Sequence, residues 1–277
     1  MAQSLPFSNL STDERRIKLI VSYDGSDFCG WAAQPDQRTV QGTLKEAICR
    51  MTGKSIEIFG ASRTDSGAHA LGQVVHFDGP LSVPIGAWKS ALNRYLPDDL
   101  RIESSHEVGN DFHCRFSAKS RTYHYCFCYQ DTSPFIARYS YLYHQNLNKV
   151  AMQKAIELLK GKHDFRAFTE QLPTHIENTV RELFQLRWIE DEHQLKLEVT
   201  GTAFLRGMMR RIAGFVFEIG RGYRPVEDVS NLLSDSRNNF QWAVILPAKG
   251  LHLIKVEYDD PPIDWRSKTN LNIPEDF

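Results

Sequence analysis

The sequence is poor in cysteine and offers no basis for a disulfide framework. Five cysteines, an odd number, are spread over 277 residues, whereas a disulfide-stapled domain is a short secreted chain with an even set. Cys126 and Cys128 alternate along an apolar segment, so they share one face of an expected strand. No second pair accompanies them as metal ligands. We therefore expect buried thiols in a reducing compartment.

Long apolar runs are also lacking. No segment approaches the roughly 20 apolar residues that a membrane helix needs. Residues 1–16 are polar and contain no apolar core of the length found in signal peptides. We therefore expect a cytoplasmic protein that does not insert into a membrane.

An excess of charge of one sign is missing too. The 33 Lys and Arg residues oppose 34 Asp and Glu residues, for a formal net charge of -1, so the whole molecule lacks the field of a non-specific nucleic-acid binder. A local basic cleft would still suffice to engage phosphates. Residues 203–224 contain five arginines against one glutamate, and this local surplus could line such a cleft.

The motifs of nucleotide-dependent and metal-dependent enzymes do not occur. Neither G-x-x-x-x-G-K-[ST] nor G-x-G-x-x-G is present, so nucleotide hydrolysis and dinucleotide binding have no support. His69 and His76 are not accompanied by H-E-x-x-H or a comparable spacing, which favours packed or hydrogen-bonded histidines over ligands. We expect no metal and no cofactor. A metal hydrolase is disfavoured, because the sequence contains no cluster of metal ligands.

The chain does contain an alternation of short strands and helices. Apolar patterning predicts strands at 17–23, 55–59, 73–77, 100–103, 121–129, 183–189, 194–199 and 251–258, and helices at 39–53, 85–96, 147–159, 204–219 and 225–233. Many connections between strands are too short for parallel crossovers. The pattern predicts an α+β fold with a mostly antiparallel sheet flanked by helices. A similar order of elements in residues 1–115 and 116–277 indicates two related halves.

One loop carries candidate chemistry. Residues 62–67 read S-R-T-D-S-G between two expected strands, so Arg63 and Asp65 sit on a loop held between rigid elements. Such a loop can present a carboxylate to a ligand with little reorganisation. The alternative is a plain turn in which the Asp65 carboxylate binds its own backbone.

This loop closely resembles the G-R-T-D-A-G-V-H-A signature of TruA-type tRNA pseudouridine synthases. Further segments resemble the family in the same order along nearly the whole chain. They are Y-D-G-S-D-F-C-G-W (23–31), R-T-V-Q-G (38–42), F-H-C-R-F-S-A (112–118), R-T-Y-H-Y (121–125), H-D-F (163–165), N-T-V-R (178–181), F-L-R-G-M-M-R-R-I-A-G (204–214) and G-L-H-L (250–253).

The resemblance implies a pseudouridine synthase fold and an isomerase that turns uridine into pseudouridine in tRNA without a cofactor. It implies Asp65 as the carboxylate that attacks the nucleotide and Arg210 as the cation paired with it. Tyr123 would stack on the uracil and Leu251 would line its pocket. From pattern alone, Tyr123 and Leu251 could equally be core residues, and Arg211 competes with Arg210 as the half-buried arginine on the predicted helix.

The RNA contacts implied by the resemblance involve four residues. Arg63 would help to flip the nucleotide out of its stack, although an exposed arginine without that role is the alternative. Phe112, Arg115 and Arg206 belong to segments expected to contact RNA. The resemblance also implies a homodimer acting in the anticodon stem-loop, around positions 38 to 40. A catalytically inactive tRNA-binding protein or chaperone on the same fold is the rival interpretation.

The chain departs from the family pattern at several places. Ser62 replaces a glycine, so a positive φ there would be strained. Gly207 replaces a histidine and would cost roughly 1 kcal/mol in the middle of a helix. Residues 244–246 are bulkier than the usual small residues, and 171–175 match poorly. These departures leave every implied catalytic residue in place and concern the choice of target uridine.

Overall fold

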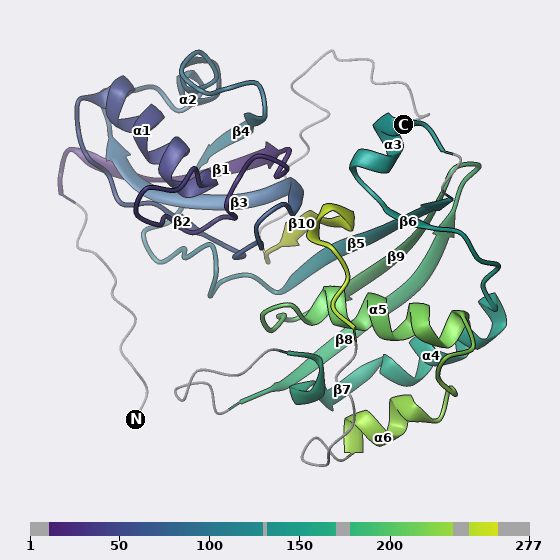
Figure 1. Ribbon diagram of the computed structural model, residues 1–277. Coiled ribbons are helices and arrows are strands. Elements are labelled where there is room, and N and C mark those ends of the chain that lie inside the picture. Colours follow the sequence, from purple (N-terminus) through teal and green to yellow (C-terminus); the bar gives the residue numbers. More distant parts are fainter. Residues whose placement is uncertain (1–10, 130–131, 170–177, 235–243, 260–277) are drawn as a thin grey trace.

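One sheet runs through the whole molecule. The computed structural model describes residues 11–129, 132–169, 178–234 and 244–259. Within them ten strands form a sheet of order β4-β1-β3-β10-β5-β9-β8-β7, with β2 beside β3 and β6 beside β5 (Figure 1). The strands are β1 (Glu14–Tyr23), β2 (Phe59–Gly60), β3 (His69–Pro80), β4 (Leu100–Glu107), β5 (Ser120–Tyr129), β6 (Tyr141–Tyr143), β7 (Gly161–Asp164), β8 (Val180–Glu190), β9 (Gln194–Gly201) and β10 (Leu251–Glu257). Only the β10–β3 and β6–β5 pairs of these are parallel, so the prediction of an α+β fold with a mostly antiparallel sheet is confirmed.

Helices pack beside the sheet in two groups. They are α1 (Val40–Thr52), α2 (Ala87–Leu92), α3 (Pro134–Arg138), α4 (Lys149–Leu159), α5 (Met208–Gly220) and α6 (Asp228–Ser234), with 3-10 turns η1 (Arg166–Phe168) and η2 (Ala248–Gly250). In Figure 1, α1 and α2 lie with β1–β4, whereas α4, α5 and α6 lie with the strands of the other half. The fully buried rings of Trp88 in α2 and Phe215 in α5 pack into the core, where large aromatic rings contribute much of the apolar burial. Across the described parts of the chain, no helix has the length and apolar character of a membrane span.

Strand β10 joins the two halves of the sheet. It pairs in parallel with β3, His252 opposite His69, and antiparallel with β5, Leu253 opposite Tyr123. The start of β3, the middle of β5 and the start of β10 therefore meet at one place. The division at residues 115 and 116 stays a prediction, and the hydrogen bonding of the sheet is continuous across it.

Local capping signals are confirmed at α1. The Thr39 hydroxyl accepts the Gly42 N–H, and Gly53 ends the helix with φ 72°. A side-chain acceptor satisfies one of the unpaired amides at the start of a helix, and glycine adopts the left-handed conformation at its end without steric cost. Both ends of this helix follow from the sequence.

The prediction for α5 was wrong at its start. The helix begins at Met208, and Gly207 caps it with φ 68°. This left-handed conformation is one that glycine adopts readily, so Gly207 interrupts the predicted helix without the cost expected for a mid-helix glycine. Phe204 and Arg206 consequently lie before α5, outside the helix.

Two other predicted elements are shorter than expected. The strand at 55–59 is confined to Phe59–Gly60, because the Ile58 carbonyl accepts a hydrogen bond from the Gln41 side chain, 2.9 Å away, in place of a strand partner. The helix at 85–96 is confined to Ala87–Leu92. Beyond it, the Asn93 side chain binds both backbone groups of Ile102, at 3.0 and 2.8 Å. The poorly matching segment 171–175 lies outside the described residues.

Candidate active site

The Asp65 carboxylate points out of its loop toward a helix of the other half. The loop lies between β2 and β3 and turns at Gly67 (φ 79°), with Ala68 N–H donating to the Asp65 carbonyl at 3.1 Å. The turn expected as the alternative is thus present in the backbone. The carboxylate nevertheless accepts a hydrogen bond from Arg210 Nη1, 2.9 Å from Oδ2. The backbone turn and the outward carboxylate are therefore compatible.

Arg210 reaches Asp65 from the first turn of α5. Its Nε donates to the Leu246 carbonyl at 2.6 Å, so the guanidinium is held between a backbone oxygen and the carboxylate. The Arg210 and Asp65 side chains are 18% and 25% exposed, so the ion pair is partly accessible to solvent. A fixed guanidinium of this kind orients the carboxylate through a charge-assisted hydrogen bond. The structure thus brings Arg210, the residue chosen from the resemblance, into contact with Asp65.

Buried polar side chains hold the loop in place. Gln73 of β3 donates to the Ser62 carbonyl at 2.7 Å and accepts from its N–H at 3.2 Å. Tyr23 at the end of β1 hydrogen-bonds to Thr64 at 2.8 Å, and burial raises the pKa of Tyr23. Buried groups with satisfied partners rigidify a loop. Sequence reasoning missed these anchors, because their partners lie on different segments.

Ser62 is accommodated without backbone strain. Among the described non-glycine residues only Asp36 has a positive φ, 57°. The strain considered for serine at this position is therefore absent. Its backbone polar groups are taken up by Gln73, as described above.

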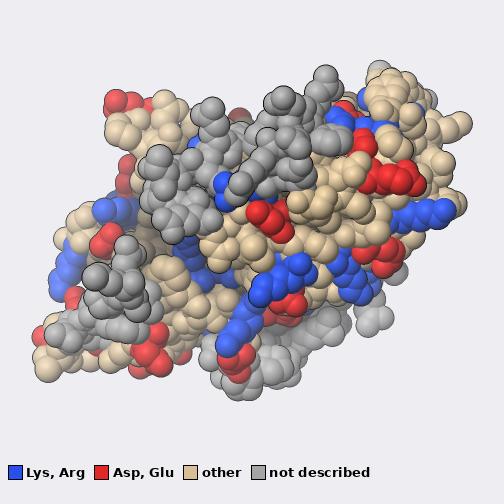
Figure 2. Space-filling view, turned by 90° about the horizontal axis from the view of Figure 1, so that it is seen from below, with Lys and Arg blue, Asp and Glu red and all other residues tan. Residues whose placement is uncertain are grey.

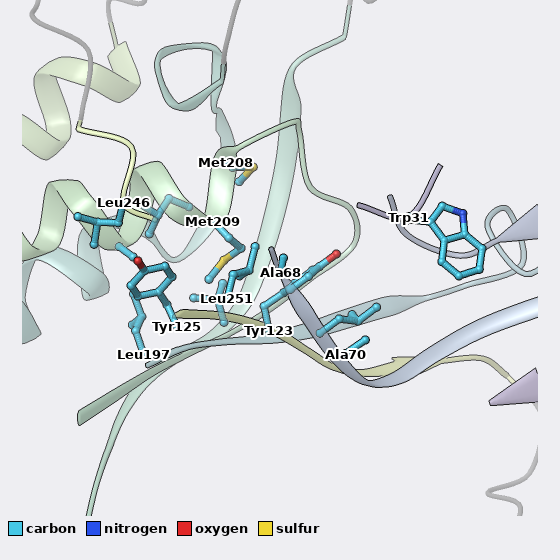
Figure 3. Packing of buried hydrophobic residues seen from close by; sticks show 14 of the residues in the cluster. Trp31, Ala68, Ala70, Tyr123, Tyr125, Leu197, Met208, Met209, Leu246 and Leu251 are labelled. Carbon is cyan, nitrogen blue, oxygen red and sulfur yellow. The ribbon is translucent and has the colours of Figure 1, made fainter. Parts of the chain in front are cut away.

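Apolar side chains form a wall beside the carboxylate. Tyr123 on β5 is 7% exposed, and its ring packs edge-on against Phe204 with centroids 4.9 Å apart. Burial raises the pKa of Tyr123, which favours its neutral form, and an interaction with Ser62 opposes that shift. Figure 3 shows Tyr123 near Leu251 and Met209, next to the start of β3. Because this wall adjoins the Asp65 loop, burial of Tyr123 and Leu251 is compatible with both a core role and a pocket role.

The arginines expected at the RNA face are exposed. Arg63 is exposed and has no hydrogen-bond or ion-pair partner in the part of the chain that the structure describes. Arg115 and Arg206 are also exposed. The Arg115 guanidinium lies 5.8 Å from the centre of the Phe116 ring, which is 57% exposed. A guanidinium group on the surface can bind a phosphate through its forked donors.

The Phe112 ring lies largely in the core, and its expected contact with RNA stays a prediction. Its ring is only 8% exposed and packs against Tyr258, with centroids 5.0 Å apart, and against His76. Phe116 is the exposed aromatic residue of the same segment.

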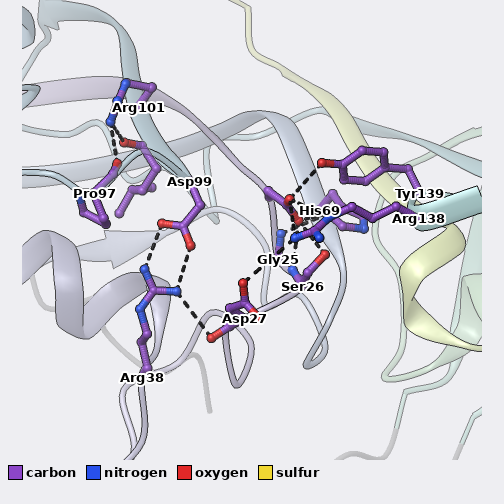
Figure 4. Close-up of polar contacts among 12 residues, drawn as sticks. Gly25, Ser26, Asp27, Arg38, His69, Pro97, Asp99, Arg101, Arg138 and Tyr139 are labelled. Atoms are coloured by element: carbon purple, nitrogen blue, oxygen red, sulfur yellow. Dashed lines mark hydrogen bonds and ion pairs between the residues drawn. The ribbon is translucent and has the colours of Figure 1, made fainter. Parts of the chain in front are cut away.

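A hydrogen-bonded cluster behind the loop includes Asp24 and His69 (Figure 4). His69 Nδ1 accepts the Gly25 N–H at 3.0 Å, so its proton lies on Nε2 and is donated to the Lys249 carbonyl at 3.2 Å. Tyr139 donates to Asp24 at 2.9 Å. Burial opposes ionisation of Asp24, but hydrogen bonds from Ser26 and Tyr139 outweigh it and lower its pKa to about 2. The cluster ties the end of the Asp65 loop to the turn that precedes Leu251.

Within this cluster, His252 should make the free energy of unfolding of the protein depend on pH. It stacks on His69 with ring centroids 4.8 Å apart, and burial lowers the pKa of His252 to about 4. An unfolded histidine has a pKa of about 6.5, so the unfolded state binds more protons between these values and stability falls as the pH falls through that window. We expect His252→Gln to reduce the loss of stability between about pH 6.5 and about pH 4, measured from urea midpoints.

The exposed His144 provides the control for this prediction. His144→Gln should leave the pH dependence of the urea midpoint as in the wild type. An equal slope for His252→Gln and wild type would contradict the assignment.

Gly25 is required for space beneath the loop. A Cβ atom at this position would lie 1.9 Å from the Ala68 carbonyl oxygen. We expect Gly25→Ala to destabilise the protein by about 1–3 kcal/mol through overpacking, which lowers the melting temperature by roughly 2–12 °C at this chain length. Gly86→Ala is the matched control, because nothing lies within 4 Å of its added Cβ. Thermal unfolding of both variants checks the prediction, and equal melting temperatures would refute it.

His76, His113 and Cys114 bring metal-binding side-chain types together. One ligand atom of each lies within 4.8 Å of the others. However, Nδ1 of His76 accepts the Cys114 N–H at 3.4 Å and Nδ1 of His113 accepts the Arg115 N–H at 3.2 Å, so both protons lie on Nε2. A metal-bound histidine instead donates its second N–H to an acceptor. The Cys114 thiol donates to the Phe59 carbonyl at 3.2 Å, and burial raises its pKa to about 12. The geometry therefore favours a packed hydrogen-bonded cluster.

Comparison with known proteins agrees with this arrangement. The sequence model of the tRNA pseudouridine synthase family matches residues 19–117 and 155–259. Proteins named tRNA pseudouridine synthase A from Oceanobacillus iheyensis and Geobacillus kaustophilus are each 40% identical over 248 residues, covering 88% and 89% of this chain and 97% and 95% of theirs. One from Maridesulfovibrio salexigens is 38% identical over 261 residues, 93% of this chain and 96% of its own. The chain therefore belongs to the family of tRNA pseudouridine synthases.

Proposed function

We propose that the protein converts uridine into pseudouridine within tRNA, with Asp65 as the carboxylate that attacks the target nucleotide. The observation that carries this proposal is the Asp65–Arg210 ion pair, 2.9 Å long and partly exposed, beside the buried Tyr123 and Leu251. Relatives covering nearly the same length bear the name tRNA pseudouridine synthase A, which supports both the reaction and the substrate class.

The reaction needs a positioned carboxylate and a shaped pocket. The bond between uracil N1 and ribose C1′ breaks, the base rotates, and C5 bonds to C1′. A proton leaves C5 and one is gained at N1, so the product is an isomer and no electron or group donor is consumed. Arg210 orients the attacking carboxylate, while Tyr123 and Leu251 provide apolar surface against which the freed base can turn. Stacking on an aromatic ring is worth roughly 1–3 kcal/mol per base.

Arg63 fits the task of flipping the nucleotide. A base inside a stem must leave its stack before a carboxylate can reach the glycosidic bond, and the exposed Arg63 lies two residues before Asp65. We expect Arg63→Ala to lower the rate at which bound tRNA is converted to product about 10- to 100-fold. The reason is that unstacking the nucleotide costs a few kcal/mol, which the arginine offsets. The rate under single-turnover conditions and the tRNA dissociation constant together measure this effect.

Arg187→Ala is the control for Arg63, since Arg187 is an exposed arginine on β8 whose partner is the buried Glu198. It should leave the rate unchanged. Loss of affinity with a normal rate in Arg63→Ala would instead make Arg63 a plain phosphate contact.

The RNA path proposed here passes the exposed Arg115, Phe116 and Arg206. On the face shown in Figure 2, Lys and Arg side chains are interspersed with Asp and Glu instead of forming one basic field. This agrees with the net charge of -1 and favours local contacts around the site over long-range attraction. By family resemblance, the target lies at positions 38 to 40 of the anticodon stem-loop, and a cytoplasmic homodimer holds the tRNA.

Incubation of the purified protein with unmodified tRNA, followed by position-resolved mapping of pseudouridine, tests the proposal. Product at 38, 39 or 40 would support both the reaction and the target. Product elsewhere would keep the chemistry and overturn the target. Tight binding without product would favour a tRNA chaperone. Light scattering of the protein with and without tRNA tests the homodimer.

A further inference from the structure

A buried arginine near the site is not used by the chemistry described above. Arg121 lies on β5, two residues before Tyr123, and is 7% exposed. Its guanidinium has no carboxylate partner among the described residues. Burial lowers the pKa of Arg121, which reflects the cost of keeping a cation there. A desolvated charge of this kind needs a structural or functional reason.

The hydrogen bonds of Arg121 all go to backbone carbonyls. Nη1 donates to Thr202 at 2.7 Å and to Ala118 at 3.3 Å. Nη2 donates to Arg115 at 2.6 Å and to Ala61 at 3.5 Å. The planar fork of a guanidinium can serve several acceptors at once, which a lysine ammonium at the end of a flexible chain cannot reproduce.

These carbonyls belong to three segments that surround the site. Ala61 begins the loop that carries Asp65. Arg115 and Ala118 belong to the segment whose exposed side chains are proposed to meet tRNA. Thr202 follows β9 and leads to α5, which carries Arg210. Arg121 thus connects the carboxylate loop, the proposed RNA segment and the approach to the partner arginine.

A second buried arginine provides a contrast. Arg16 on β1 is 4% exposed and donates to the Asn110 and Phe112 carbonyls at 2.6 and 3.1 Å, so it holds the other end of the same segment. Its charge is balanced by Asp78, 2.8 Å away, and the hydrogen bond to Asp78 raises its pKa. The fold therefore supplies a carboxylate where an arginine only braces the segment. At Arg121, next to a site for a polyanion, it supplies carbonyls alone.

We propose that Arg121 is a positioning residue that holds the Asp65 loop in register with the RNA-contacting segment, so that docked tRNA meets a correctly placed carboxylate. It acts through the backbone and does not touch the reacting atoms. This inference rests on the proposed function, and turnover by the wild type in the same assay separates failure of one from failure of the other.

Arg121→Lys is the informative variant, because it keeps the charge and loses the fork. We expect the single-turnover rate at saturating enzyme to fall about 10- to 100-fold, since a displacement near 1 Å can cost about 100-fold. The tRNA dissociation constant should stay within about threefold of wild type, which is well below 1.4 kcal/mol. Arg15→Lys is the matched control, because Arg15 also donates to two backbone carbonyls, those of Leu81 and Val83 at 3.0 and 2.9 Å. It should keep the wild-type rate at saturation, even where its melting temperature falls.

Four outcomes decide the matter. A slower saturated rate with unchanged affinity in Arg121→Lys supports the proposal. A wild-type rate overturns it, because charge alone would then suffice. Lower affinity with a normal saturated rate overturns it in favour of a phosphate contact. A reduced amplitude at a normal rate also overturns it, because a misfolded fraction lowers the amount of active enzyme but not the rate of each active molecule.

Discussion

Asp65→Asn should abolish pseudouridine formation while leaving tRNA binding near the wild-type level. The amide has the shape of the carboxylate and its oxygen can still accept the hydrogen bond that Arg210 Nη1 gives to Asp65 Oδ2 at 2.9 Å. The change therefore removes the proposed nucleophile and preserves the surroundings. Loss of a catalytic nucleophile typically costs about 10⁴-fold or more in turnover. Tritium release from C5-labelled uridine in tRNA measures the rate, and filter binding measures the affinity.

Asp36→Asn is the control for this substitution. Asp36 is exposed and has a φ of 57°, a conformation that asparagine tolerates well. The rate of pseudouridine formation and the melting temperature of Asp36→Asn should match those of the wild type. Appreciable turnover by Asp65→Asn would remove Asp65 from the mechanism, and loss of binding in the same variant would show that the loop had rearranged.

Arg210→Met should have the second largest effect. Methionine fills much of the same space but removes the donors to both Asp65 and the Leu246 carbonyl. The carboxylate would lose the group that orients it, and removal of one preorganised donor at an active site costs about 10²- to 10³-fold in rate. Arg210→Lys retains the charge but not the two-sided contact, so we expect an intermediate rate. Single-turnover kinetics at saturating enzyme measure both variants.

Arg221→Met tests whether the effect is specific to Arg210. Arg221 follows α5 at its opposite end and contacts Gln145 and Tyr223 at the surface. Its loss should leave the saturated rate unchanged. A rate for Arg210→Met within about threefold of the wild type, a difference of less than 1.4 kcal/mol, would mean that Asp65 is oriented by other groups.

Signals confined to one element could be predicted from the sequence. Thr39 and Gly53 bound α1 because their effects are local, and alternation identifies β5, which the structure places at Ser120–Tyr129. Predictions failed where a side chain from another segment replaced a backbone partner. Gln41 takes the Ile58 carbonyl that a longer β2 would have used. Apolar patterning contains no information about such a contact.

For the candidate site, too, some features could be predicted from the sequence and others could not. The resemblance pointed to Asp65, Arg210, Tyr123 and Leu251, and the structure brings these residues to one junction of β3, β5 and β10. The resemblance could not show that Phe112 is buried while Phe116 is exposed. Whether a ring in a short loop faces the core or the solvent depends on the neighbouring Tyr258 and His76, which come from other segments.

The order of amino acids is enough to specify the family, the α+β class and the loop that bears the carboxylate, because each is written in contiguous motifs and local periodicity. The family resemblance names Arg210, but its contact with Asp65 depends on how α5 docks, since the two residues are 145 positions apart. The bracing role proposed for Arg121 is likewise invisible in the chain, because its acceptors come from segments up to 81 positions away. Tertiary packing brings such groups within hydrogen-bond distance, and the spacing of residues along the sequence does not indicate which distant groups will meet.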